Sequence, residues 1–231
     1  LTAKALGVEL LIHYGHSCLI PINQTKDIKV LYVFVDIQID PKHFVDTIKM
    51  NFDPKTRLAL VSTIQFVTTL QGVSSILKEN SYTVSIPQIK PLSPGEILGC
   101  TSPQINCADV LVYLGDGRFH LESAMIANPK LKAYCYNPYN KEFTEEFYDH
   151  VRLTLVREQF IADSKAIKKY GVIMGTLGRQ GSPKVVKHLV DNLKNHNKHV
   201  VVILLSEIFP GKIDLFRNIG AFVQIACPRL S

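Results

Sequence analysis

Short apolar runs recur along this chain, and each has the length and the Val, Ile and Leu content of one buried strand. These runs are KVLYVFVD (29–36), RLALVSTI (57–64), YTVSIP (82–87), DVLVYLGDG (109–117), KAYCYNP (132–138), YGVIMGTLG (170–178), HVVVILLSE (199–207) and AFVQIACP (221–228). Segments with apolar residues at helical spacing lie between several of them, namely PKHFVDTIKMNF, QFVTTLQGVSSILKEN, HLESAMIANP and SPKVVKHLVDNLKNHN. Because strands and helices alternate, we predict an α/β fold with small, mainly parallel sheets flanked by helices.

The longest interval between two of these runs is NKEFTEEFYDHVRLTLVREQFIADSKAIKKYG, which contains no strand-like run. Its charged residues alternate with Phe, Leu, Val and Ile at roughly helical spacing, which predicts a long helix bridging two sheets. We therefore expect a unit of four or five strands before this segment and a unit of three strands after it.

Composition changes this picture little. The 231 residues are 46% hydrophobic and 20% charged, which is typical of a globular chain long enough for two modest α/β units or one large one. The net charge of +6 is spread over helical faces rather than clustered in a basic stripe, so it does not favour nucleic-acid binding. No stretch has the pattern of a signal peptide or a membrane span, and the cytosol is the expected location.

The loop GTLGRQGSP, residues 175–183, follows a predicted strand and enters a predicted helix. Glycines let backbone N–H groups turn toward an anion, Ser182 can cap the helix, and Pro183 suits its first position. The loop lacks the Walker and dinucleotide-binding spacings, so a tight turn and a ligand cradle both remain open. Arg179 and Gln180 at the tip suit a carboxylate or a nucleobase.

A second loop between a strand and a helix, LGDGRFHLES, presents Asp116, Arg118 and His120 at the same predicted edge. Asp-Gly is also a common turn pair and His often caps or packs, so a purely structural role remains open. Near the start, HYGHSCLIP brings together two histidines and Cys18, but a structural zinc site normally has four ligands in paired short spacings.

The five cysteines show no compact spacing, which argues against a secreted disulfide framework. Cys107 and Cys135 lie at or inside apolar runs, where we expect them to be buried as small hydrophobic residues. Cys100 in EILGCTSP and Cys227 in VQIACPRLS each follow an apolar run that predicts a buried strand, in loops where a thiolate can be reached. Soft thiolate sites suit iron–sulfur clusters or zinc, although loop cysteines of cytosolic proteins are often unligated.

Seven strings carry a resemblance to a known family. The strings HYGHSCLIP, GCTSP, YLGDGRFHLES, YDH, GTLGRQGSP, LLSEIFP and ACPRLS resemble, in the same order, those of the eukaryotic first-step diphthamide enzymes, subunit 1 of 2-(3-amino-3-carboxypropyl)histidine synthase. The resemblance runs from about residue 1 to residue 231. It implies a non-standard radical S-adenosylmethionine enzyme that transfers the 3-amino-3-carboxypropyl group to a histidine of translation elongation factor 2.

The resemblance also implies three related α/β domains around a central crevice, each supplying one cysteine to a 4Fe-4S cluster. Cys100 matches the ligand from the second domain and Cys227 the ligand from the third, while the first ligand is expected before Leu1, so that this segment alone is expected to be inactive. The implied divisions are 1–25 as a remnant of the first domain, 26–140 as the second domain, 141–169 as a bridging helical segment, and 170–231 as a truncated third domain.

Physical roles for the loop residues around this centre are hypotheses based on the helix N-terminus and the guanidinium groups. Arg179, Gln180, Gly181, Ser182 and Arg229 are expected to bind S-adenosylmethionine. Asp116 and His120 are expected to contact the cofactor or the substrate histidine as catalytic residues. The implied partners are a homologous second subunit, elongation factor 2 and a small iron-binding electron donor, with no DNA and no membrane. Two alternatives are a non-catalytic scaffold or electron-relay subunit and a nucleotide-type binding module without a cluster.

Overall fold

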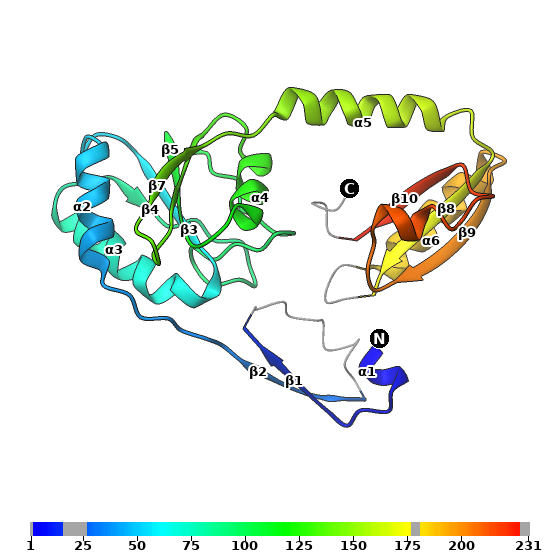
Figure 1. Cartoon of the computed structure of the whole chain (residues 1–231), viewed down its shortest axis with the longest axis horizontal. Coiled ribbons are helices and arrows are strands. Elements are labelled where there is room, and N and C mark those ends of the chain that lie inside the picture. Colours follow the sequence, from blue (N-terminus) through cyan, green and yellow to red (C-terminus); the bar gives the residue numbers. More distant parts are fainter. Residues whose placement is uncertain (1, 16–26, 177–180, 227–231) are drawn as a thin grey trace. The chain divides into compact units, whose positions relative to one another are not determined.

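The computed structural model describes residues 2–15, 27–176 and 181–226 (Figure 1). In chain order its elements are α1 (Thr2–Ala5), β1 (Leu10–Tyr14), β2 (Lys29–Val33), α2 (Pro41–Asn51), β3 (Leu58–Ser62), the 3-10 turn η2 (Ile64–Phe66), α3 (Val67–Glu79), β4 (Val84–Ser85), β5 (Val110–Leu114), α4 (Phe119–Ala127), β6 (Lys132–Tyr136), β7 (Phe143–Glu146), α5 (His150–Ser164), β8 (Lys169–Gly175), α6 (Pro183–Asn195), β9 (His199–Leu205), α7 (Pro210–Ile213) and β10 (Ala221–Ile225).

The chain divides into two compact units, one built mainly on Leu31–Asp149 and the other on His150–Ser231. The division falls inside the segment that the sequence assigns to a bridge. The domain boundaries implied by the resemblance stay predictions. Within the described residues, no helix has the length and apolar character needed to cross a membrane.

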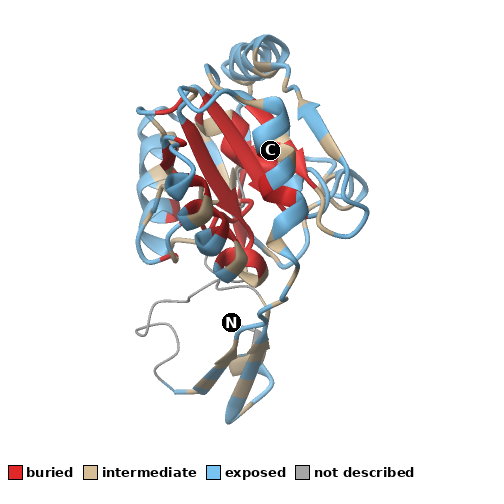
Figure 2. Cartoon of the chain, turned by 90° about the vertical axis from the view of Figure 1, so that its left-hand side faces the viewer, coloured by how far each residue is buried: buried red, intermediate tan, exposed pale blue. Residues whose placement is uncertain are grey.

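The first unit contains a five-stranded sheet in the order β4-β3-β5-β6-β7. The strands are parallel except β7, which pairs antiparallel with β6. Every residue of β3 and β5 is buried, as expected for parallel strands covered on both faces. Figure 2 shows that strands inside the layer of helices carry much of the buried part of the chain.

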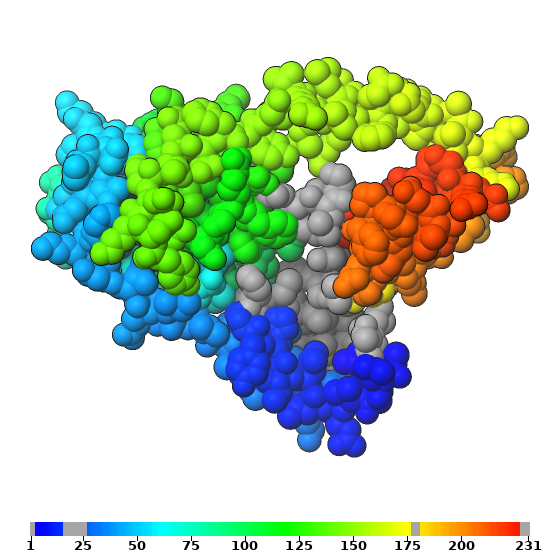
Figure 3. Space-filling model, in the orientation of Figure 1, coloured from blue at the N-terminus to red at the C-terminus, as the bar shows by residue number. Residues whose placement is uncertain are grey.

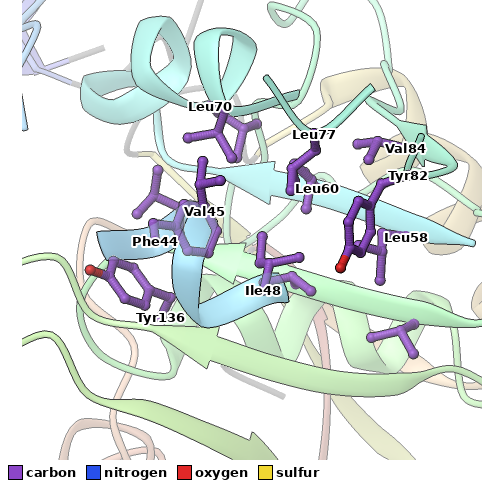
Figure 4. Close-up of a cluster of buried hydrophobic side chains, with 14 of the residues drawn as sticks. Phe44, Val45, Ile48, Leu58, Leu60, Leu70, Leu77, Tyr82, Val84 and Tyr136 are labelled. Carbon is purple, nitrogen blue, oxygen red and sulfur yellow. The ribbon is translucent and has the colours of Figure 1, made fainter. Parts of the chain in front are cut away.

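Helices cover both faces of this sheet with separate apolar clusters. On one face α2 and α3 contribute Phe44, Ile48 and Leu70, which pack with Leu60 of β3 (Figure 4). On the other face α4 packs with the alternate residues of β3, β5 and β6. Each fully buried side chain of this size contributes about 1.5–3 kcal/mol of burial free energy, so the sheet between these clusters is a rigid base for its loops.

The second unit has a three-stranded parallel sheet in the order β10-β8-β9. Val186 of α6 packs on Val172 and Met174 of β8. By contrast α5 has no buried residue, and Figure 3 shows its yellow-green side chains exposed along the helix. The α/β class agrees with the prediction from the sequence, and the three runs predicted after the bridge form this sheet, but the five strands of the first sheet are not the five that were predicted.

Two predictions about individual strands were wrong. The run at 29–36 forms β2, which is partly exposed and pairs with β1 in a two-stranded sheet instead of joining the parallel sheet. The segment after the fifth run was expected to lack a strand, yet its first part forms β7. Lys141 takes a positive φ of 59° in the turn before β7, and this turn brings the chain back antiparallel to β6.

Candidate functional site

The carboxyl ends of three parallel strands lie in register at one edge of the five-stranded sheet. Ser62 ends β3 opposite Leu114 of β5, and Leu114 lies opposite Tyr136 of β6. Because β4 lies on the other side of β3 from β5, the direction of the connections changes between β3 and β5. Open α/β sheets bind their ligands outside such a switch point, so the loops that follow β3 and β5 lie where a ligand is expected.

Cys100 lies beside this edge, in a closed turn. Glu96 forms a single parallel bridge with Ser62, and Leu98 and Thr101 exchange backbone hydrogen bonds of 2.9 and 3.2 Å. Gly99 and Cys100 therefore occupy the tip of a two-residue turn. The thiol is half-buried, with its Sγ 3.6 Å from the Thr101 hydroxyl oxygen. The expected strand directly before Cys100 is not formed, because this run makes only the single bridge.

A close contact places the Cys100 turn next to the loop that carries Asp116 and His120. A Cβ atom added to Gly99 would lie 2.0 Å from Cε1 of Phe119, so the Gly99 backbone rests on the Phe119 ring. Phe119 begins α4 and also contacts the His120 ring edge to face, with ring centroids 5.3 Å apart. Asp116 is exposed and His120 is half-buried. The structure thus brings Cys100 and the Asp116–His120 loop together.

Arg118 of the same loop has a structural role. Its guanidinium donates a 2.8 Å hydrogen bond to the Phe147 carbonyl and forms ion pairs with Glu122 and Glu146 at 3.3 and 3.1 Å. These contacts join the start of α4 to the end of β7. Its position in the sequence does not reveal this use, because Glu146 lies on β7 and Phe147 directly after it, and this strand was not predicted.

Three buried hydroxyl groups at the same edge were not predicted from the sequence. The side-chain oxygens of Ser62, Thr63 and Tyr113 are buried; the Tyr113 phenol interacts with the Thr63 hydroxyl, and the Ser62 hydroxyl has no hydrogen-bond partner among the described residues. Burial, followed by the nearby Cys135 and Asp116, raises the pKa of the Tyr113 phenol, so this group stays a neutral donor. Buried polar groups are normally paired, which makes these hydroxyls notable. The only sequence signal is a Ser-Thr pair directly after the apolar run LALV.

The loop GTLGRQGSP, residues 175–183, is partly described. Ser182 is the N-cap of α6, its side chain accepts from the Val185 amide at 3.5 Å, and Pro183 is in the first turn, so the predicted cap is confirmed. A Cβ atom on Gly181 would lie 2.4 Å from the Gly175 carbonyl oxygen, so only glycine fits there without a shift. Arg179 and Gln180 lie outside the described residues, and the ligand-binding role of this loop stays a prediction.

The remaining cysteines differ in their surroundings. Cys135 is buried in β6, as predicted, and burial raises the pKa of its thiol to about 11. Cys107 was predicted to be buried but is exposed, because the chain after the Cys100 turn crosses the surface before β5 begins. Cys227 and Arg229 lie outside the described residues.

The described part of the chain therefore provides one accessible thiol of the proposed cluster. Residues 2–15, 27–176 and 181–226 contain no group of three or more His, Cys, Asp or Glu side chains that could hold a metal ion. Cys100 itself fits a thiolate ligand, since its thiol is half-buried at the tip of a fixed turn. Of the weak zinc pattern, only His13 is described, and it contacts the Tyr32 ring at 5.4 Å between centroids.

Relatives and solved structures resemble this chain over its whole length. It is 56% identical over 232 residues to 2-(3-amino-3-carboxypropyl)histidine synthase subunit 1 of Mus musculus, in a match covering 100% of this chain and 53% of the mouse protein. Identity to the Schizosaccharomyces pombe protein of the same name is 52% over 238 residues, covering 100% of this chain and 54% of that protein. The chain thus spans about half the length of the curated relatives it matches.

The fold matches Dph2 from Pyrococcus horikoshii with a TM-score of 0.76 at 26% identity, covering 99% of this chain and 67% of that chain. The structure of that protein with a 4Fe-4S cluster matches with a TM-score of 0.77 at 24% identity, covering 99% and 66%, and this likeness concerns the fold alone. Residues 1–231 match the family model described as "Putative diphthamide synthesis protein", and the chain belongs to this family.

Proposed function

We propose that this protein catalyses the first step of diphthamide biosynthesis. In this reaction the 3-amino-3-carboxypropyl group of S-adenosylmethionine is transferred to a histidine of translation elongation factor 2. Membership of the family and the shared name of the curated relatives support the proposal. The observation that carries it is the half-buried Cys100 in a closed turn at the carboxyl edge of the sheet, beside the loop of Asp116 and His120.

A 4Fe-4S cluster is the proposed cofactor, and a crystal structure of Dph2 from Pyrococcus horikoshii contains such a cluster. Cys100 and Cys227 would hold two of its irons, and a third cysteine would come from another part of the protein. When bound, the reduced cluster supplies the electron that cleaves the bond between the sulfur and the γ-carbon of S-adenosylmethionine. Cys100 contributes a thiolate whose backbone is fixed by the Leu98–Thr101 turn, which limits the movement of a ligand during electron transfer.

The loops around the cluster are assigned to substrate binding. Arg179, Gln180, Gly181 and Ser182 at the start of α6, together with Arg229, bind the carboxylate of S-adenosylmethionine. A helix N-terminus and a guanidinium both favour an anion, and the Ser182 cap and the close approach of Gly181 hold this loop to β8.

Asp116 and His120 are assigned to the substrate histidine. The exposed Asp116 carboxylate can accept a hydrogen bond from an imidazole N–H and so orient the ring carbon that receives the transferred group. His120 is half-buried against Phe119 and lies on the first turn of α4, where its position is fixed by the helix. Both residues belong to the loop that contacts the Cys100 turn.

The proposal includes partners and a location. A homologous second subunit forms the complex, elongation factor 2 is the protein substrate, and a small iron-binding protein donates electrons. The words "subunit 1" in the names of the relatives are consistent with an assembly of several chains. We place the protein in the cytoplasm, with no DNA and no membrane as a partner.

The test is reconstitution of the full-length protein. The protein and its second subunit are loaded anaerobically with iron and sulfide, incubated with S-adenosylmethionine, a reductant and elongation factor 2, and the product is analysed by mass spectrometry. We expect a brown protein and a 3-amino-3-carboxypropyl group on one histidine. A colourless protein would favour a binding module without a cluster. A brown protein that gives no product would favour a scaffold or electron-relay subunit.

A further inference from the structure

Asn128 connects the segment after the Cys100 turn to helix α4. The residue is the C-cap of α4 and is only 7% exposed. Its side-chain oxygen accepts a 2.7 Å hydrogen bond from the Ile105 amide, and its side-chain nitrogen donates 2.9 Å hydrogen bonds to the carbonyls of Pro103 and Ala124. One side chain thus holds two points of the loop against the helix.

The chemistry of this position selects asparagine. The site requires one acceptor facing an N–H group and two donors facing carbonyl oxygens, and an amide provides both in one planar group. An aspartate of the same shape would keep the bond from Ile105 but would place a carboxylate against the carbonyls of Pro103 and Ala124. Because the group is buried, water cannot compensate for this change.

Two other contacts bind the same loop to the same helix. The hydroxyl oxygens of Ser102 and Ser123 are 2.8 Å apart, and the Gly99 backbone rests on Phe119 at the start of α4. The chain is therefore fixed to α4 both before and after Cys100. Asp116 lies just before α4 and His120 lies in its first turn. The position of α4 therefore determines the positions of Asp116 and His120 as well as that of the Cys100 turn.

We infer that Asn128 is a positioning residue for Cys100: it holds the cysteine turn on α4, at a fixed place relative to Asp116 and His120. The expected effect on cluster binding rests on the proposed function. The expected effect on the position of the Cys100 turn does not. Groups that support a metal ligand typically change metal affinity by about 10–100-fold when they are replaced, because they fix the geometry that the ligand must keep.

The test compares Asn128→Asp with Asn80→Asp in the full-length protein. Asn80 is a control for the C-cap position, because it is the C-cap of α3 and donates to the Ile76 carbonyl four residues earlier, as Asn128 donates to Ala124. Asn80 is exposed, and its side-chain oxygen accepts from Lys49 of α2 and not from the segment that follows Cys100. The first measurement is the rate of iodoacetamide reaction at Cys100 in the cluster-free protein, followed by peptide mass spectrometry. The rate at the already exposed Cys107 provides the reference.

We expect the rate at Cys100 to rise by about threefold or more in Asn128→Asp, because the loop opens locally more often, and to stay unchanged in Asn80→Asp. After anaerobic reconstitution, Asn128→Asp should bind iron and sulfide about tenfold more weakly and give a shifted paramagnetic resonance spectrum of the reduced cluster. A Cys100 rate equal to that of the unmodified protein would overturn the inference, and so would an equal rise in both variants.

Two further outcomes are also decisive. If Asn128→Asp does not fold, Asn128→Ala, which removes the hydrogen bonds to Ile105 and Pro103 without burying a charge, takes its place, and an unchanged Cys100 rate in that variant overturns the inference. If the unmodified protein binds no cluster, the proposed function fails, and the alkylation rates still decide whether Asn128 positions the turn.

Discussion

The contact between Gly99 and Phe119 predicts that the effect of Gly99→Ala on the free energy of unfolding depends on whether the Phe119 ring is present. A Cβ atom at Gly99 would lie 2.0, 2.6 and 3.0 Å from three atoms of the Phe119 ring, whereas carbon atoms normally approach to about 3.5–4.0 Å. The ring is 46% exposed and can move, but it must give up its contact with the turn. We expect Gly99→Ala to lower the free energy of unfolding by about 1–3 kcal/mol, the usual cost of overpacking.

The same substitution should have the opposite effect once the ring is removed. Gly99 does not have a positive φ, so alanine can adopt its conformation. In the Phe119→Ala background, Gly99→Ala should therefore be neutral or should stabilise the protein by up to about 0.5–1 kcal/mol, because alanine restricts the unfolded chain. The effects of Gly99→Ala in the two backgrounds then differ by about 1–4 kcal/mol, which is at or above the coupling energy of about 0.5–3 kcal/mol found for residues in contact.

Urea unfolding of the four proteins in this cycle measures the coupling directly. Gly72→Ala is a suitable control, because Gly72 lies in α3 with no atom within 4 Å of the added Cβ. It should stabilise the protein by about 0.5–1 kcal/mol in both backgrounds. If Gly99→Ala costs the same with and without the Phe119 ring, the ring does not fix the cysteine turn and the reasoning is refuted.

Three further predictions concern other parts of the chain. Arg57 donates from its amide and its Nε to one Asp109 oxygen at 3.0 and 3.1 Å and holds the pKa of this carboxyl at about 2, below its usual 3.8. The contribution of this pair to the free energy of unfolding is complete above about pH 4 and is lost as the pH falls toward 2. The free energy of unfolding of Asp109→Asn should therefore fall less over this pH range, and acid transitions identical to those of the unmodified protein would contradict this prediction. Gly181→Ala should lower stability by about 1–3 kcal/mol in thermal unfolding, because the new Cβ would meet the Gly175 backbone, and a neutral effect would show that the approach is not close. At pH 8, Cys107 should react with iodoacetamide in the folded protein, while Cys135, with a pKa of about 11, should react only after unfolding; equal rates would contradict the burial of Cys135.

Patterns set by burial could be predicted from the sequence. The strands β3 and β5 are covered on both faces, so their residues form continuous apolar runs that stand out from their surroundings. The cap of α6 was equally clear, because Ser182 and Pro183 act on the adjacent turn. Local interactions and complete burial leave a signal within a few residues.

Features that depend on distant partners could not be predicted. Glu145 and Glu146 of β7 have a spacing that also suits a helix, and only pairing with β6 makes this segment an edge strand. The run before Cys100 is as apolar as a strand, but it meets β3 at one bridge and then turns. Asn128 lies in an ordinary helix end, and its contacts with the cysteine loop appear only when the chain is folded.

We propose Cys100 as a cluster ligand in an enzyme that modifies a histidine of elongation factor 2. The most direct measurement is product formation by the reconstituted full-length protein and its second subunit, with Cys100→Ala compared with Cys107→Ala, a cysteine exposed seven residues further along the same loop. We predict that Cys107→Ala gives the 3-amino-3-carboxypropyl histidine detected by mass spectrometry and that Cys100→Ala gives none, with a weakened cluster spectrum. Full product formation by Cys100→Ala would contradict the account.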